Sequence, residues 1–258
     1  MRVFRVAVLA IVSYACSLAG DDQIIRSPRT SERVESLAPG HQAVLRALYQ
    51  DMFTYVPPPS TTSSPSSATF AVTYNGFTPA TQTAFQYAVD IWSSLLVSSV
   101  TIRVTANWTA LPPGVLGSAG ASGAYRDFPG APQAGTWYAV ALAEKLASTD
   151  LNLITESDID ANFSSAFPNW YFGTDGNTPP GQYDFVSVVL HELCHGLTFA
   201  GSMTVSSGQG SWGLGSGFPF IFDRVAENGA GESLLNTALF PNPSSALATQ
   251  LQSNSVFY

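Results

Sequence analysis

The sequence has little charge, few histidines and almost no cysteine. Only 11% of the 258 residues are charged, whereas 45% are hydrophobic, so the chain can form a large core. The formal net charge is −8, and an acidic surface repels phosphate backbones, so nucleic acid is not an expected partner. The two cysteines are Cys16 and Cys194. If Cys16 leaves with an N-terminal leader, no internal disulfide can form.

The first 19 residues have the layout of a secretory signal peptide. Arg2 and Arg5 give a basic start, an apolar run follows, and small residues lead to a cleavage site near Ala19. The apolar run is short for a membrane span of about 20 residues. We therefore expect a secreted, extracellular protein with no stable membrane association after signal cleavage. Export without disulfides is typical of bacterial secretion, so the sequons at Asn107 and Asn162 are interpreted as chance matches.

Two segments separate the signal peptide from the main domain. Residues 20–56 contain a short amphipathic helix pattern. They are interpreted either as an inhibitory pro-segment or as a plain N-terminal extension. Residues 57–68 are rich in Pro, Ser and Thr, which is typical of a linker.

Residues 69–258 are expected to form the main domain, α+β in class. It opens with the alternating stretch TFAVTYNG, which predicts a strand that ends at an Asn-Gly turn. Thr78 and Pro79 then form a typical helix start. The stretch VTIRVTANW alternates again and predicts a second, half-buried strand.

The stretch DFVSVVLHELCHGLTFAG, residues 184–201, carries most of the information on function. Asp184 can cap a helix. His191 and His195 stand four residues apart, so their side chains are neighbours on one helical face and can converge on one ion. Glu192 follows His191 directly, so its side chain points about 100° around the helix axis from that face. It can reach a metal-bound water without being a ligand. Cys194 faces away from the histidines and is interpreted as a packed core thiol.

These residues predict zinc chemistry. Zinc binds neutral imidazoles plus a third protein ligand and leaves one position for water. It lowers the pKa of that water to about 7 and polarises a carbonyl group. We therefore expect Zn²⁺ as the cofactor, His191 and His195 as metal ligands, and Glu192 as the general base in peptide-bond hydrolysis.

The motif VVLHELCHGLTFAG resembles the zincin metallopeptidases, and residues 69–258 resemble a group of secreted bacterial members. The supporting stretches are FQYAVDIWSSLL, VTIRVTANWTALPPGVLGSAG, NWYFGTDGNTPPGQYDFVSVVLHELCHGL and FIFDRVAENGAGESLLN. The resemblance implies a twisted mixed sheet packed on an active-site helix. It also implies that a peptide substrate lies extended against an edge strand within residues 115–130.

The third zinc ligand departs from the metzincin pattern HExxHxxGxxH. Thr198 stands at the glycine position and Gly201 at the ligand position. One interpretation takes the ligand from a carboxylate of this chain, with Asp223 preferred over Glu227 and Glu232. The other expects the ligand beyond Tyr258, since the resemblance implies longer relatives with a further histidine and a methionine turn.

Two functions from different classes remain at this point. The first is a secreted zinc-dependent endopeptidase that acts on protein or peptide substrates. The alternative is a catalytically weak or inactive secreted binding module that retains the zincin fold. The presence of Glu192 favours the peptidase, because a binding module has no chemical need for the base. The sequence predicts neither a cleavage preference nor an oligomeric state.

Overall fold

The computed structural model describes residues 23–26 and 68–257. The chain divides into two compact units. We call residues 26–123 and 139–200 the histidine unit, because they contain His191 and His195. We call residues 1–25, 124–138 and 201–258 the C-terminal unit. The predicted signal peptide, the N-terminal extension except residues 23–26, and the linker except Ala68 lie outside the described residues.

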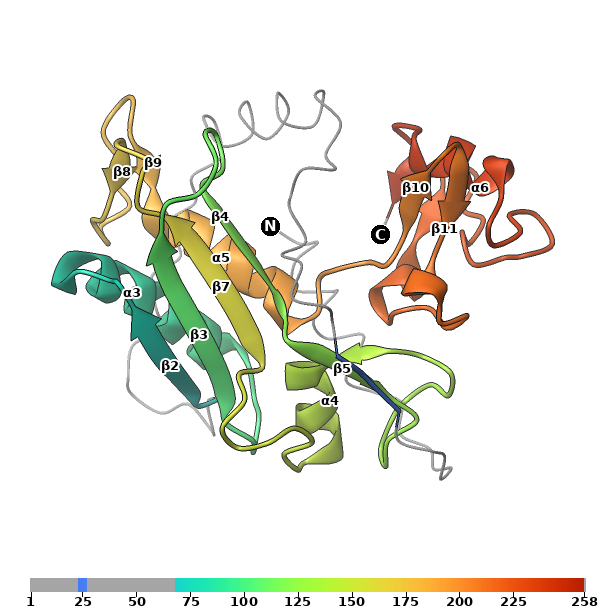
Figure 1. The fold of residues 1–258 in the computed structure, drawn as a ribbon, viewed down its shortest axis with the longest axis horizontal. Coiled ribbons are helices and arrows are strands. Elements are labelled where there is room, and N and C mark those ends of the chain that lie inside the picture. Colours follow the sequence, from blue (N-terminus) through green and yellow to red (C-terminus); the bar gives the residue numbers. More distant parts are fainter. Residues whose placement is uncertain (1–22, 27–67, 258) are drawn as a thin grey trace. The chain divides into compact units, whose positions relative to one another are not determined.

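A four-stranded sheet forms the centre of the histidine unit (Figure 1). Its strand order is β2-β3-β7-β4, in which β2, β3 and β7 run parallel and β4 is antiparallel to β7. The sheet is therefore mixed, with β2 and β4 at its edges. The bounds are Phe70–Asn75 for β2, Ile102–Thr109 for β3, Gly117–Ala121 for β4 and Ile159–Ser164 for β7.

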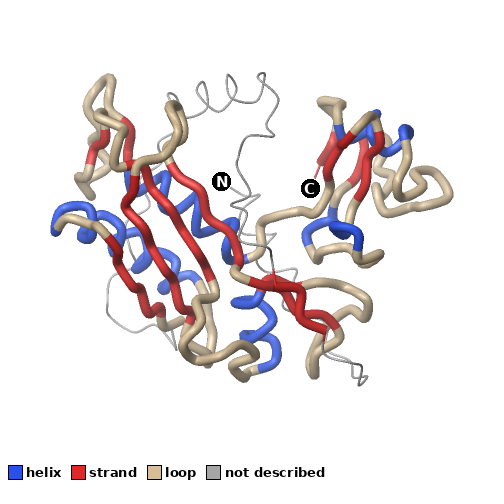
Figure 2. The backbone as a smooth tube through the Cα atoms, viewed as in Figure 1, coloured by secondary structure: helices blue, strands red, loops and turns tan. Residues whose placement is uncertain are grey.

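Helices cover one face of this sheet (Figure 2). Helix α3, Pro79–Leu95, connects the parallel strands β2 and β3, and Thr78 caps it as predicted. Helix α5, Phe185–Leu197, packs against α3, β4 and β7, and the short helix α4, Val140–Ala147, packs against α5. The two-residue strands β8, Trp170–Tyr171, and β9, Tyr183–Asp184, pair just before α5. The predicted strand, helix, strand opening of the domain is thus confirmed.

The core of the histidine unit lies between the sheet and the helices. Alternate residues of β3 and β7 point into it, because successive side chains in a strand face opposite sides. Phe85 of α3, Phe163 of β7 and Phe185 of α5 are fully buried there and contact one another edge to face. Burying this aromatic group fixes the position of α5 beneath the sheet.

The opposite face of the sheet is polar. Asn75, Asn107 and Asn162 are neighbours on β2, β3 and β7, and their side-chain amides form a hydrogen-bonded row. Asn107 and Asn162 therefore lie inside strands with their amides in use, which agrees with the interpretation of both sequons as chance matches.

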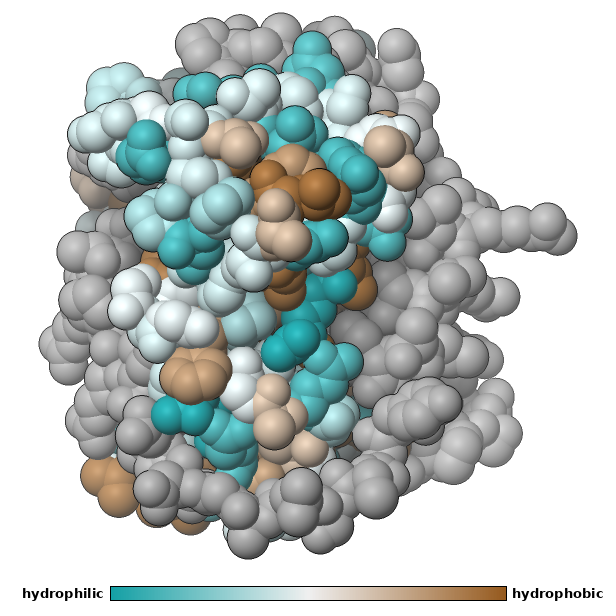
Figure 3. All heavy atoms as spheres, turned by 90° about the vertical axis from the view of Figure 1, so that its right-hand side faces the viewer, coloured by the Kyte–Doolittle hydropathy of each residue, from teal (hydrophilic) through white to brown (hydrophobic). Residues whose placement is uncertain are grey.

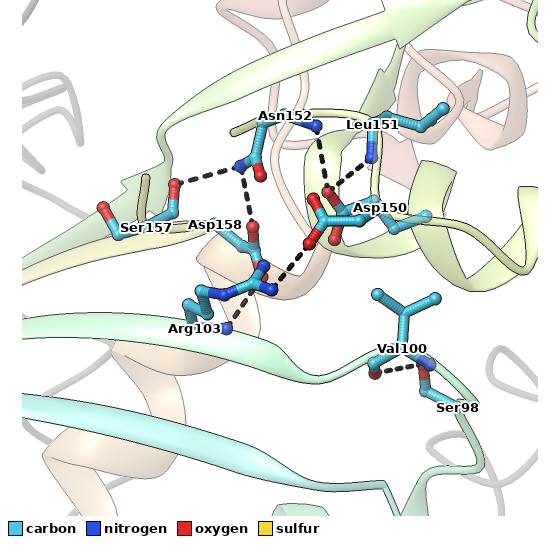
Figure 4. A network of polar contacts seen from close by, with 9 residues as sticks. Ser98, Val100, Arg103, Asp150, Leu151, Asn152, Ser157 and Asp158 are labelled. Atoms are coloured by element: carbon cyan, nitrogen blue, oxygen red, sulfur yellow. Dashed lines mark hydrogen bonds and ion pairs between the residues drawn. The ribbon is translucent and has the colours of Figure 1, made fainter. Parts of the chain in front are cut away.

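A buried polar network lies at the amino ends of β3 and β7 (Figure 4). Arg103 forms an ion pair with Asp150 at 2.6 Å. Asp158 is fully buried, and its carboxylate accepts from the Arg103 amide at 2.7 Å and from the Asn152 side chain at 2.8 Å. Glu144 of α4, 1% exposed, accepts from the amides of Leu151 and Asn152. These bonds hold the loop between α4 and β7.

The C-terminal unit is built from two separate stretches of chain. The first stretch begins with strand β5, Gly123–Arg126, and ends with strand β6, Tyr138–Ala139. These two strands form a three-stranded sheet with β1, Gln23–Arg26. Trp137 pairs with Phe220 through hydrogen bonds to Pro219 and Ile221, both 2.9 Å. The Arg126 guanidinium stacks on the Phe218 ring at 4.1 Å. These contacts join residues 124–138 to residues 201–258.

The rest of the C-terminal unit surrounds a small second core of Ala226, Leu234, Phe240 and Leu247. Its elements are β10 (Thr204–Ser206), β11 (Gln209–Ser211), η2 (Gly213–Gly215), η3 (Phe222–Val225), β12 (Glu227–Asn228), α6 (Ser245–Leu251) and β13 (Val256–Phe257). Figure 3 looks onto this unit, where apolar side chains gather among hydrophilic ones. Its large exposed apolar residues are Leu214, Val225, Leu239 and Phe257.

None of the helices in the described ranges is both long and apolar enough to span a membrane.

Candidate metal centre

Helix α5 carries the predicted site residues and is fixed at both ends. It begins at Phe185 because the Asp184 carboxylate accepts from the Ser187 amide at 3.0 Å, as an N-cap residue does. It ends at Leu197, and Thr198 follows with φ 143°. In between, the Trp92 indole of α3 donates to the Leu190 carbonyl at 3.2 Å. This bond anchors the helix next to His191.

The two histidine rings converge. Their Nε2 atoms lie 3.1 Å apart, and the ring centroids lie 4.7 Å apart. The Nδ1 atom of His195 lies 2.7 Å from the Phe199 carbonyl oxygen. Because a carbonyl can only accept, Nδ1 carries the proton and Nε2 presents its lone pair toward His191. Two imidazole nitrogens at this separation can share a single ion at the Zn–N distance of about 2.0–2.1 Å.

Both the burial and the charge of His191 suit a metal ligand. Burial, followed by the neighbouring His195, lowers the pKa of His191 to about 4. The ring is therefore neutral at neutral pH, and only neutral imidazole offers a lone pair to a metal.

Glu192 is a buried carboxyl group with a free oxygen. The residue is 5% exposed, and its Oε2 atom has no hydrogen-bond partner among the described residues. Burial raises its pKa to about 7, while the backbone amide of Ala119 in β4 opposes that shift. Glu192 thus lies between α5 and the edge strand β4, beside the histidines in sequence.

The donor set fits zinc. Two imidazoles are preferred by zinc and other late transition metals, whereas calcium and magnesium prefer oxygen ligands. The unpaired Oε2 atom of Glu192 leaves a buried polar atom that a water molecule near the ion would satisfy.

Cys194 has the environment of a core thiol. It is a free cysteine packed at the border of the hydrophobic core. Burial raises its pKa to about 12, so the thiol stays protonated and is a poor ligand and nucleophile. This agrees with the interpretation from its helical position.

Asp223, the preferred in-chain candidate for the third ligand, organises a loop. It is 1% exposed and belongs to the C-terminal unit. Its Oδ1 atom accepts from the Ser202 amide at 2.7 Å, and its Oδ2 atom accepts from the Phe220 amide at 2.8 Å and from the Ser202 hydroxyl. Each carboxylate oxygen is therefore already hydrogen-bonded, which accounts for the burial of the charge.

The other two carboxylate candidates also lie in the C-terminal unit. Glu232 accepts from the Asn228 side chain at 2.8 Å, and Glu227 is exposed on β12. Within the ranges that the structure describes, no group of three or more His, Cys, Asp or Glu side chains could hold a metal ion. The third ligand stays a prediction.

Two contributors to the site are backbone groups that sequence reasoning missed. The Phe199 carbonyl sets the tautomer of His195, and the Ala119 amide acts on Glu192. Any residue type supplies such groups, so no signal in the sequence marks them. The edge strand that contains Ala119 does fall within the range 115–130 implied by the resemblance.

A family model described as SPBPB7E8-like matches residues 138–209, which include α4, β7 and α5. The match covers less than half of the chain. No curated protein and no solved structure matches the sequence.

Proposed function

We propose that the protein is a secreted zinc-dependent endopeptidase with Glu192 as its general base. One observation carries the proposal: two histidine Nε2 atoms lie 3.1 Å apart on α5, next to a buried glutamate whose Oε2 atom is unpaired. A purely structural pair of histidines has no need for a buried carboxyl group next to it in sequence, one oxygen of which has no partner among the described residues.

His191 and His195 would hold the zinc ion through their Nε2 atoms. When bound, zinc supplies Lewis acidity and makes a water molecule acidic enough to serve as a nucleophile near neutral pH. The Phe199 carbonyl contributes by keeping the proton of His195 on Nδ1, so that Nε2 stays available.

Glu192 would move the proton. Its carboxylate accepts a proton from the attacking water and later passes it to the departing amine. A base works best when its pKa is near the working pH, and burial places the pKa of Glu192 at about 7. The unpaired Oε2 atom is the candidate proton acceptor.

The edge strand β4 supports an extended peptide as the substrate. Ser164 donates to Leu116, and Ser122 donates to Asp158, so the even-numbered residues bond to β7. By alternation, Gly117, Ala119 and Ala121 direct their backbone groups toward the edge that no other described strand pairs with, and the Ala119 amide acts on Glu192. The strand has no charged residue and no proline, which natural edge strands use to prevent pairing. Such an edge suits β-strand addition by a peptide.

The proposal is tested with the variant Glu192→Gln. We expect wild-type protein loaded with zinc to cleave casein, and the variant to bind zinc equally while its kcat falls by about 10²–10⁴-fold. Zinc binding is measured by competition with a chromogenic chelator, and cleavage by release of labelled peptides. The matched control Asp90→Asn changes an exposed carboxylate of α3 and should cleave at the wild-type rate. Equal cleavage by wild type and Glu192→Gln would contradict the assignment.

A secreted binding module remains the second candidate. It is favoured by the lack, within the described residues, of a three-residue metal-binding group. Stoichiometric zinc binding through His191 and His195, with no cleavage that depends on Glu192, would support this candidate instead.

A further inference from the structure

The two glycines of β4 are there for different reasons. At Gly117 an added Cβ atom would meet the Phe163 ring at 3.0 Å, so close packing requires glycine. At Gly120 an added Cβ atom would meet nothing within 4 Å, and φ is not in the left-handed region. Neither packing nor backbone conformation explains this glycine. Glycine in a strand costs roughly 0.5–1 kcal/mol and often marks a close approach by a ligand or another backbone.

Asp160 is the cross-strand neighbour of Gly120 on β7. Ile159 and Ala161 are buried against the helices, so Asp160 and Gly120 lie on the opposite, polar face of the sheet. The Asp160 carboxylate accepts from the Ser157 hydroxyl at 2.5 Å and is exposed. It forms no ion pair with a described residue. Arg103, on the same face of β3, is bound to Asp150 instead.

We propose that a lysine or arginine side chain of an extended substrate passes over Gly120 and forms an ion pair with Asp160. This inference rests on the proposed function and names the substrate class of the same site. A strand added to β4 lies two strand spacings from β7, about 9–10 Å. The long stems of lysine and arginine cover that distance, whereas short side chains do not. The missing side chain at Gly120 leaves their path open.

The position of Gly120 places this subsite close to the reacting bond. Ala119, the preceding residue of β4, has the backbone amide that acts on Glu192. The charge is also complementary to only one class of side chain. The residues of the polar face directly beside Gly120 and Asp160 are the neutral Ser118, Asn162 and Thr105. The charge of Arg103, further along the same face, is paired with Asp150. The subsite therefore favours a basic residue near the cleaved bond and disfavours an acidic one.

The test uses a peptide set in which one position near the cleavage site is varied among Lys, Arg, Gln and Glu. For zinc-loaded wild type we expect kcat/KM to be highest with Lys or Arg. Asp160→Asn should lower kcat/KM for these basic peptides about two- to fivefold, the size of an exposed ion pair, and leave the Gln peptide unchanged. Asp160→Lys should reverse the preference toward Glu. Gly120→Val should remove the preference for basic residues by obstructing the path.

The control Asp90→Asn removes an exposed carboxylate from α3 and should not change the preference. Thermal unfolding of each variant separates misfolding from altered selectivity. If wild type cleaves the set without preference, or if Asp160→Asn does not alter the preference, the inference is overturned while the proposed function stands.

A binding measurement separates the failure of the two proposals. If no peptide is cleaved, the proposed function fails, and fluorescence anisotropy with Glu192→Gln still reports on the subsite. Tighter binding of the Lys peptide than of the Gln peptide, lost on adding Asp160→Asn, would support the inference without turnover. Equal binding of both peptides would overturn it.

Discussion

At the scale of single residues, the histidine unit contains two buried glutamates with different tasks. Glu192 and Glu144 both have a pKa raised to about 7, mainly by burial. Glu192, next to His191 in sequence, has an oxygen without a partner among the described residues, whereas Glu144 uses Oε1 to accept from the amides of Leu151 and Asn152. The difference in partners, and not in pKa, distinguishes the candidate catalytic group from the structural one.

Glu144 makes the stability of the histidine unit dependent on pH. Burial and the neighbouring Asp158 raise its pKa from 4.5 to about 7 in the folded protein. The folded state therefore holds the proton more tightly than the unfolded state. The stability contributed by the protonated group is fully present below pH 4.5 and is lost as the pH rises through 7.

Glu144→Gln should remove this dependence, because glutamine does not titrate and can still accept from both amides. The free energy of unfolding of wild type, relative to the variant, should fall by on the order of 3 kcal/mol between pH 4.5 and above 7. Urea denaturation at a series of pH values measures the difference. The exposed control Glu227→Gln should track wild type, and a constant difference for Glu144→Gln would argue against the raised pKa.

The sequence predicted the two histidines and the glutamate because their spacing on a helix determines where their side chains lie. It could not identify Ala119 or Phe199 as contributors, since both act through backbone groups. It also could not decide the role of Asp223, whose partners Ser202 and Phe220 come together only through loop conformation.

At the scale of elements, Gly196 allows α5 to lie close to β7. A Cβ atom at this position would come within 2.4 Å of the Ile159 Cγ2 atom. Replacing glycine by alanine inside a helix normally increases the stability of the fold by about 1 kcal/mol. Here the overlap with a buried strand side chain outweighs that gain, because a packed core does not yield easily.

Gly196→Ala should therefore destabilise the protein by about 1–3 kcal/mol. Combining it with Ile159→Ala, which removes the overlapping atoms, should cost less than the sum of the two single changes. The free energies of unfolding of wild type, the two single variants and the double variant are measured by chemical denaturation. Gly120→Ala, at a site with open space, is the control and should not destabilise. Strict additivity of the two changes would exclude the proposed contact.

Local signals were sufficient to predict where α3 and α5 begin. Thr78 and Asp184 cap these helices as their sequence positions indicated. Strand β7, Ile159–Ser164, has no such local signal. Its strand form follows from pairing with β3 and β4, which are distant in sequence, so local propensity could not decide it.

At the scale of the whole molecule, the chain passes between its two units four times. The C-terminal unit combines residues 124–138 with residues 201–258. Trp137 and Phe220, which pair across this join, are far apart in sequence. No periodicity or turn signal predicts such a pairing, so the division into units emerged only from the structure.

A cut between Ala200 and Gly201 should not separate the pieces. A site-specific protease sequence inserted there would produce two fragments still joined by the Trp137 hydrogen bonds and by Arg126 on Phe218. We expect them to co-elute in size-exclusion chromatography and to separate in denaturant. Trp137→Ala keeps the backbone bonds but removes the buried indole and its 2.9 Å hydrogen bond to the Ser216 hydroxyl, so it should weaken the join and release the smaller fragment. Separation of the unaltered fragments under native conditions would show that these contacts are insufficient.

No described strand pairs with the outer edge of β4, which affects how the protein must be handled. Since neither charge nor proline guards Gly117–Ala121, a strand from a neighbouring molecule can pair there as readily as a peptide. Concentrated samples should therefore self-associate through this edge and lose the proposed peptidase activity as they do so, and dilution should restore it.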